Sequence, residues 1–118
     1  MSATVLIVDD NARFRVRARR WLEADGYAVV AEAGDGAAAL EAARRHRPAV
    51  VLLDIQLPDM SGLSVAEQLT AQPDAPAVVL TSTHDPADFG ERLARSGARG
   101  FVPKAELSGK RLSALLAE

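Results

Sequence analysis

Ala49-Val50-Val51-Leu52-Leu53-Asp54 is the stretch of sequence that decides the fold of this chain. An unbroken apolar run that ends at an acid is typical of a strand buried on both faces of a parallel sheet. Other short apolar runs end in the same way, at Asp9-Asp10, Thr81 and Lys104. Because the carboxyl ends of parallel strands meet at one edge of the sheet, we expect these polar side chains to gather in one site.

Strand-like runs alternate with helix-like segments along the whole chain. We expect strands at residues 4–8, 27–31, 49–53, 77–80 and 100–103. We expect helices at 12–24, 36–46 and 63–69, one from an Asp85-Pro86 cap to near Gly97, and a last one carrying Leu112, Leu115 and Leu116. This alternation predicts an α/β fold with a parallel sheet and helices on both of its faces. The length of 118 residues predicts a single domain over 1–118.

The composition excludes several classes of protein. The chain has 16 acidic and 14 basic residues and a net charge of -2, so it lacks the basic character of most nucleic-acid-binding domains. It contains no Cys, which excludes disulfides and thiolate metal sites. The apolar runs are too short to cross a bilayer, and the first residues do not resemble a signal peptide. We therefore expect a cytoplasmic protein that does not bind nucleic acid directly.

The residues at the strand ends predict a particular chemistry. Two carboxylates held close together near a protein surface repel each other by about 4 kcal/mol, so a cluster of acids needs a neutralising cation. Mg²⁺ prefers oxygen ligands and is commonly held by one or two carboxylates together with phosphate oxygens. A carboxylate can also act as a nucleophile toward phosphorus. Lys104 and the Thr81 hydroxyl would then stabilise the phosphoryl oxygens.

Five motifs, in order and at consistent spacing, give the chain a family resemblance. They are Val8-Asp9-Asp10, Leu52-Leu53-Asp54-Ile55, Leu57-Pro58-Asp59-Met60-Ser61-Gly62, Leu80-Thr81-Ser82 and Gly100-Phe101-Val102-Pro103-Lys104. With these motifs the chain resembles, over essentially its whole length, the receiver domain of bacterial two-component response regulators. The resemblance implies a flavodoxin-like (βα)5 fold with the strand order 2-1-3-4-5.

The resemblance also implies roles for individual residues. Asp54 would accept a phosphoryl group from a histidine kinase or a phosphotransfer protein, and Thr81 and Lys104 would assist. Mg²⁺ would be held by Asp9, Asp10, Asp54 and the backbone carbonyl of Gln56. The chain would be a signalling switch that assists its own phosphorylation and dephosphorylation, and not an enzyme.

Further positions are assigned by the same resemblance. Thr81 would move toward the phosphoryl group and Phe101 would swing inward with it, which changes the face that a partner binds. Gln56 and Thr83 occupy the two variable positions that tune dephosphorylation in the family, and Gln56 could orient an attacking water. The output would be a DNA-binding domain outside this sequence or a separate partner protein, and homodimerisation is also open.

The residues on either side of Lys104 refine this interpretation. Most relatives carry a proline after the lysine, whereas here Ala105 follows Lys104 and Pro103 precedes it. We therefore predict a trans peptide bond after Lys104, because a cis bond before a residue other than proline costs about 3–4 kcal/mol. The Pro-Lys-Ala arrangement resembles the receivers of LuxR-type regulators.

Three other functions were weighed. A haloacid-dehalogenase-type phosphatase needs a second acid two residues after its nucleophile, but that position is Gln56. A flavodoxin relative needs a hydroxyl- and glycine-rich phosphate loop where this chain has Asp9-Asp10-Asn11. A pseudo-receiver, which would act as a phosphorylation-independent interaction module, is the alternative that stays open, although it would usually have lost an acid or the lysine.

Overall fold

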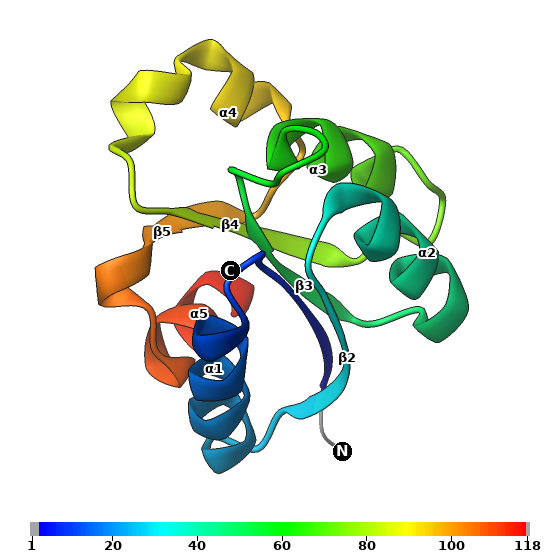
Figure 1. The fold of residues 1–118 in the computed structure, drawn as a ribbon, viewed down its shortest axis with the longest axis vertical. Coiled ribbons are helices and arrows are strands. Elements are labelled where there is room, and N and C mark those ends of the chain that lie inside the picture. The colour runs from blue at the N-terminus through cyan, green and yellow to red at the C-terminus, as the bar shows by residue number, and fades with distance from the viewer. Residues whose placement is uncertain (1–2, 118) are drawn as a thin grey trace.

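The sheet has five parallel strands in the order β2-β1-β3-β4-β5 (Figure 1). This computed structural model describes residues 3–117. The strands are β1 (Thr4–Val8), β2 (Ala28–Ala33), β3 (Val50–Asp54), β4 (Ala77–Ser82) and β5 (Gly100–Pro103). The predicted doubly wound, flavodoxin-like fold and its strand order are confirmed.

Helices cover both faces of the sheet. The helices are α1 (Ala12–Ala24), α2 (Gly36–His46), α3 (Gly62–Thr70), α4 (Glu91–Arg95) and α5 (Gly109–Leu116), with 3₁₀ turns η1 (Pro86–Phe89) and η2 (Lys104–Glu106). Helices α1 and α5 lie together on one face, and α2, α3 and α4 lie on the other (Figure 1). Among residues 3–117, no helix has both the length and the apolar character needed to cross a lipid bilayer.

The core consists of two apolar layers separated by the sheet. In β1, Val5 and Ile7 pack on the side of α1 and α5, whereas Leu6 and Val8 pack on the side of α2 and α3. Residues of β3 alternate in the same way, and all of them are buried. Alternation of side chains along a strand puts every second residue into the same layer. The apolar runs of the central strands are therefore divided between the two layers and buried in both, as the sequence predicts.

Local capping explains where the helices begin. The side chains of Asn11, Asp35 and Ser108 accept hydrogen bonds from backbone N–H groups in the first turns of α1, α2 and α5. The predicted bounds of α1 and α2 are confirmed. Helix α2 ends at a left-handed residue, Arg47, directly before Pro48.

Several strands extend beyond the predicted bounds because pairing continues there. Strand β2 runs from Ala28 to Ala33, since Val8 of β1 still pairs with Ala33. Strand β3 includes Asp54, which pairs with Thr81 in β4. Asp54 and Thr81, which follow apolar runs, are thus held by neighbouring strands.

The predicted single helix from Asp85 to near Gly97 is wrong. The segment forms η1 and the short α4, which are separated at Gly90. Gly90 has φ 58° and ψ -146°, a backbone conformation that favours glycine and that interrupts a helix. The predicted inward orientation of Phe89 and Leu93 is nevertheless confirmed, because both pack against the core on the α3 side.

Candidate functional site

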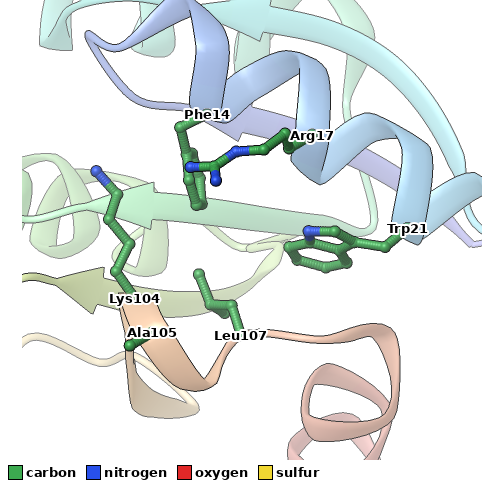
Figure 2. Close-up of a pocket in the computed structure, with 6 residues that line it drawn as sticks. All are labelled: Phe14, Arg17, Trp21, Lys104, Ala105 and Leu107. Carbon is green, nitrogen blue, oxygen red and sulfur yellow. The ribbon is translucent and has the colours of Figure 1, made fainter.

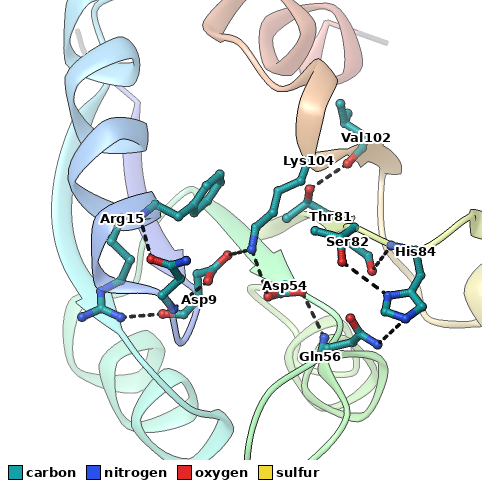
Figure 3. A network of polar contacts seen from close by, with 12 residues as sticks. Asp9, Arg15, Asp54, Gln56, Thr81, Ser82, His84, Val102 and Lys104 are labelled. Carbon is teal, nitrogen blue, oxygen red and sulfur yellow. Dashed lines mark hydrogen bonds and ion pairs between the residues drawn. The ribbon is translucent and has the colours of Figure 1, made fainter.

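Three carboxylates meet at the carboxyl edge of the sheet, as the sequence predicts. Figure 3 shows two of them, those of Asp9 and Asp54. Asp9 and Asp10 follow β1, and Asp54 ends β3. One oxygen from each carboxylate lies within 4.8 Å of the others. Asp9 is fully buried and Asp54 is 4% exposed, whereas Asp10 faces solvent. The cluster therefore has a dry interior and one open side.

Lys104 brings a positive charge to this cluster from the end of β5. Its Nζ lies 2.7 Å from Asp9 Oδ2 and 3.5 Å from Asp54 Oδ2. The same ammonium group lies 4.6 Å from the centre of the Phe14 ring, a cation–π distance. Helical periodicity places Phe14 in the core, but no signal in the sequence indicates its contact with Lys104. The predicted neutralising lysine is in place, and it is closer to Asp9 than to Asp54.

The surroundings of Asp54 shift its protonation equilibrium. Burial raises the pKa of Asp54, and the neighbouring charge of Asp9 adds to this effect. The N–H of Gln56, which donates to Asp54 Oδ1 at 3.1 Å, and the charge of Lys104 lower the pKa without cancelling the increase. Burial alone would lower the pKa of Lys104, but the hydrogen bond and charge of Asp9 and the charge of Asp54 raise it overall. Lys104 is therefore a permanent cation at this site.

The donor atoms of the cluster fit a hard divalent cation. Asp9 Oδ2 is buried, and among the residues that the structure describes its one polar partner is the Lys104 ammonium at 2.7 Å. A carboxylate oxygen can accept more than one partner, so Asp9 Oδ2 can also bind a cation. The other donors are carboxylate oxygens of Asp10 and Asp54, which are the kind of ligand that Mg²⁺ prefers. Three carboxylates against one lysine also leave an excess of negative charge.

Thr81 and Phe101 lie on the far side of Asp54 from α1. Thr81 is fully buried, and its hydroxyl donates a hydrogen bond of 2.7 Å to the backbone carbonyl of Val102. Phe101 is half-buried, and its ring centre lies 6.4 Å from that of Phe89. In this structure the Thr81 hydroxyl therefore bonds to β5, and Phe101 packs against the segment before α4.

Gln56 and Thr83 both contact His84, an exposed residue of the loop that follows β4. Gln56 Nε2 lies 3.3 Å from His84 Nε2, and Thr83 Oγ1 lies 3.4 Å from His84 Nδ1 (Figure 3). His84 joins the two positions that the resemblance assigns to dephosphorylation. A histidine without metal-ligand spacing offers no pattern from which this contact could be predicted.

The loop between β3 and α3 is hydrogen-bonded to the start of α2 and to the residue that follows β3. Asp59 Oδ1 and Oδ2 accept hydrogen bonds from Gly36 N–H at 2.7 Å and from Ala37 N–H at 3.0 Å. These bonds, that of Gly36 first, lower the pKa of Asp59. Gly62 N–H donates to the Ile55 carbonyl at 2.6 Å, and this close approach leaves no room for a Cβ atom. The loop thereby connects the end of β3 to the start of α2.

An open groove of about 410 Å³ lies beside the cluster, between α1 and the segment after β5 (Figure 2). Its lining residues are Phe14, Arg17, Trp21, Lys104, Ala105 and Leu107. The predicted trans peptide after Lys104 is confirmed, since residues 3–117 contain no cis peptide bond. The groove leads from the exposed face of α1 to the lysine of the site.

Comparison with known families identifies this arrangement. The family model "Response regulator receiver domain" matches residues 5–116. The chain belongs to the response regulator receiver family. The family match confirms the resemblance seen in the sequence. Receiver domains are the signalling switches of two-component systems and bind Mg²⁺ at an acidic pocket.

Individual members of the family are similar to this chain in sequence and in structure. A putative transcriptional regulator of Pseudomonas aeruginosa is 40% identical over 102 residues, which are 86% of this chain and 49% of that protein. The signal receiver domain of the putative response regulator NarL from Mycobacterium tuberculosis superposes with a TM-score of 0.88 at 35% identity, covering 98% of this chain and 94% of that one. A LuxR-family response regulator from Aurantimonas sp. has the same TM-score of 0.88 at 31% identity, covering 99% and 86%. The chain spans about half the length of the first curated relatives it matches.

Proposed function

We propose that this receiver accepts a phosphoryl group on Asp54 from a histidine kinase or a phosphotransfer protein. The observation that carries this proposal is the position of the Asp54 carboxylate. It is almost fully buried at the carboxyl end of β3, between two other acids, with Lys104 at 3.5 Å. A carboxylate in such surroundings raises the free energy of the unphosphorylated state, which argues for a reactive role over a packing role.

The proposed reaction is a transfer between two nucleophiles. An oxygen of ionised Asp54 forms a bond to phosphorus while the bond from phosphorus to the donor's histidine nitrogen breaks, and that nitrogen keeps the electron pair and takes up a proton. Lys104 holds the negative charge of the phosphoryl oxygens. Asp9, Asp10, Asp54 and the backbone carbonyl of Gln56 would hold Mg²⁺, which when bound neutralises charge on the acids and on the phosphoryl group.

The proposed switch links Thr81 to Phe101. The Thr81 hydroxyl, now bonded to the Val102 carbonyl at 2.7 Å, would turn to donate to a phosphoryl oxygen. Phe101, half-buried beside Phe89, would move into the space that this rotation opens. Movement of these groups changes the face formed by α4, β5 and α5. Coupling energies of this kind are typically about 1–3 kcal/mol, enough to change a partner's affinity by one or two orders of magnitude.

The proposed partners follow from the surfaces around the site. The groove along α1 suits the donor protein, because it carries Arg17 and leads to Lys104 (Figure 2). Matched relatives are named as transcriptional regulators and are about twice as long, so an output domain or partner protein is proposed to bind the face formed by α4, β5 and α5. Homodimerisation on phosphorylation is a further proposal. We also propose that residues 1–118 act as one cytoplasmic receiver domain. Because the net charge is -2, we propose that this domain does not bind nucleic acid directly.

The test is the intact mass of the protein after incubation with Mg²⁺ and acetyl phosphate. Wild type should gain the mass of one phosphoryl group, and Asp54→Asn should gain none. Asp74→Asn, which makes the same chemical change at an exposed residue far from the cluster, is the control and should behave as wild type. If wild type binds Mg²⁺ but gains no mass from acetyl phosphate or from a histidine kinase, the chain acts instead as a pseudo-receiver.

A further inference from the structure

A hydrogen bond between Gln56 and His84 bridges the loops that follow β3 and β4 (Figure 3). The Gln56 backbone N–H donates to Asp54 Oδ1 at 3.1 Å, so this residue is attached to the proposed acceptor. Its side-chain amide nitrogen reaches away from Asp54 to His84 Nε2 at 3.3 Å. The bridge therefore closes one edge of the space in front of the Asp54 carboxylate.

The direction of the bridging bond assigns the tautomer of His84. An amide nitrogen donates hydrogen bonds and does not accept them, so His84 Nε2 must be the acceptor. The neutral ring then carries its proton on Nδ1, which lies 3.4 Å from Thr83 Oγ1 and donates to it. Gln56, His84 and Thr83 thus form one chain of hydrogen bonds around the edge of the site.

His84 is in turn attached to the sheet. Its backbone N–H donates to Ser82 Oγ at 3.0 Å, and Ser82 is buried in β4 directly after Thr81. This bond fixes the backbone of His84, and the contact of Nδ1 with Thr83 Oγ1 restricts the ring, although His84 faces solvent. A ring held in this way can restrict the long and otherwise mobile side chain of Gln56, which would lose its fixed rotamer without that contact.

We propose that His84 is a positioning residue that holds the Gln56 amide at the edge of the site and thereby sets the rate at which phosphoryl-Asp54 is hydrolysed. The inference rests on the proposed phosphorylation of Asp54. In this hydrolysis a water oxygen forms a bond to phosphorus, the bond from phosphorus to the Asp54 oxygen breaks, and the water proton leaves to solvent with release of inorganic phosphate. Because the Gln56 amide nitrogen is bound to His84, its Oε1, to which no residue in 3–117 donates, is left to accept a hydrogen bond from that water.

The test measures the loss of phosphate from receivers loaded with acetyl phosphate and Mg²⁺, followed by intact mass. His84→Ala should slow phosphate loss about two- to fivefold, the range that one neutral, solvent-exposed hydrogen bond supplies. In a Gln56→Ala background, His84→Ala should cause no further change, because the group that it positions is absent. His84→Gln, whose side-chain oxygen can accept from the Gln56 amide, should restore part of the rate. His46→Ala, at an exposed histidine of α2, is the control.

The outcomes separate this inference from the function on which it rests. If wild type takes up no phosphoryl group, the proposed function fails and the role of His84 fails with it. If uptake is normal but His84→Ala leaves the rate of loss unchanged, only the positioning role is overturned. Equal effects of His84→Ala with and without Gln56 would also overturn it, since His84 would then act independently of the amide.

Discussion

Asp54→Asn is expected to make the metal-free receiver more stable. Asn keeps an oxygen that can accept the Gln56 N–H, so the substitution removes the charge with little change in shape. At an effective dielectric constant of about 20, charges within 4.8 Å of each other repel by at least about 3.5 kcal/mol, and Lys104 at 3.5 Å attracts Asp54 by about 4.7 kcal/mol. Repulsion from the two other acids therefore exceeds the attraction, although solvent screens exposed Asp10. We expect a net gain of about 1–2 kcal/mol at pH 7.

Thermal unfolding without divalent cations measures this gain. A change of this size raises Tm by about 4–8 °C in a domain of this length. Adding Mg²⁺ should stabilise wild type more than Asp54→Asn, because the variant lacks one ligand carboxylate, and the difference should shrink or reverse. Asp74→Asn, at an exposed acid outside the cluster, should leave Tm nearly unchanged. A lower Tm for metal-free Asp54→Asn would refute the reasoning, since the attraction of Lys104 would then dominate.

The dependence on pH provides a second check of the same prediction. The pKa of Asp54 is higher in the folded protein than in the unfolded chain, so the folded state binds more protons between those two values. The free energy of unfolding therefore falls as pH rises through this window. The advantage of Asp54→Asn should be complete above the folded pKa and should disappear below the unfolded one. An advantage that does not vary with pH would show that charge is not its cause.

Three further substitutions test the frame around the site. Gly62→Ala should lower the free energy of unfolding, measured with urea, by about 1–3 kcal/mol. The new Cβ would collide with the Asp54 carbonyl and lie 2.7 Å from the Ile55 Cα. An unchanged urea midpoint would contradict this. Thr81→Val should cost about 1–3 kcal/mol in the same assay by leaving the buried Val102 carbonyl without its donor, whereas Thr81→Ser should retain most of the stability. The pKa of Asp59 is lowered on folding, so its contribution is present at neutral pH and is lost as pH falls through the folded pKa. Asp59→Asn should accordingly lower Tm at pH 7, and the Tm values of variant and wild type should converge in acid. If the two Tm values differ by the same amount at every pH, Asp59 does not have this role at the start of α2.

The sequence alone identified the strands of the sheet and the residues at their ends. Apolar runs such as 49–53 have few alternatives to a central parallel strand, and the topology of such a sheet brings Asp9, Asp54 and Lys104 to one edge. Capping side chains such as Asp35 act within one turn of the helices that they start, so those helix bounds were also predictable. These signals are local, and each can be read from a few neighbouring residues.

Only the tertiary structure decided how those residues contact one another. The closer pairing of Lys104 with Asp9, the bonds from Asp59 to the start of α2 and the bridge from Gln56 to His84 each join segments far apart in the chain. The break at Gly90 likewise depends on how the segment packs beside α3, because an isolated glycine in a helical pattern is often tolerated. Such contacts depend on strand register and loop path to within an ångström. The amino-acid pattern determines which residues arrive at the edge of the sheet, whereas packing determines which atoms meet there.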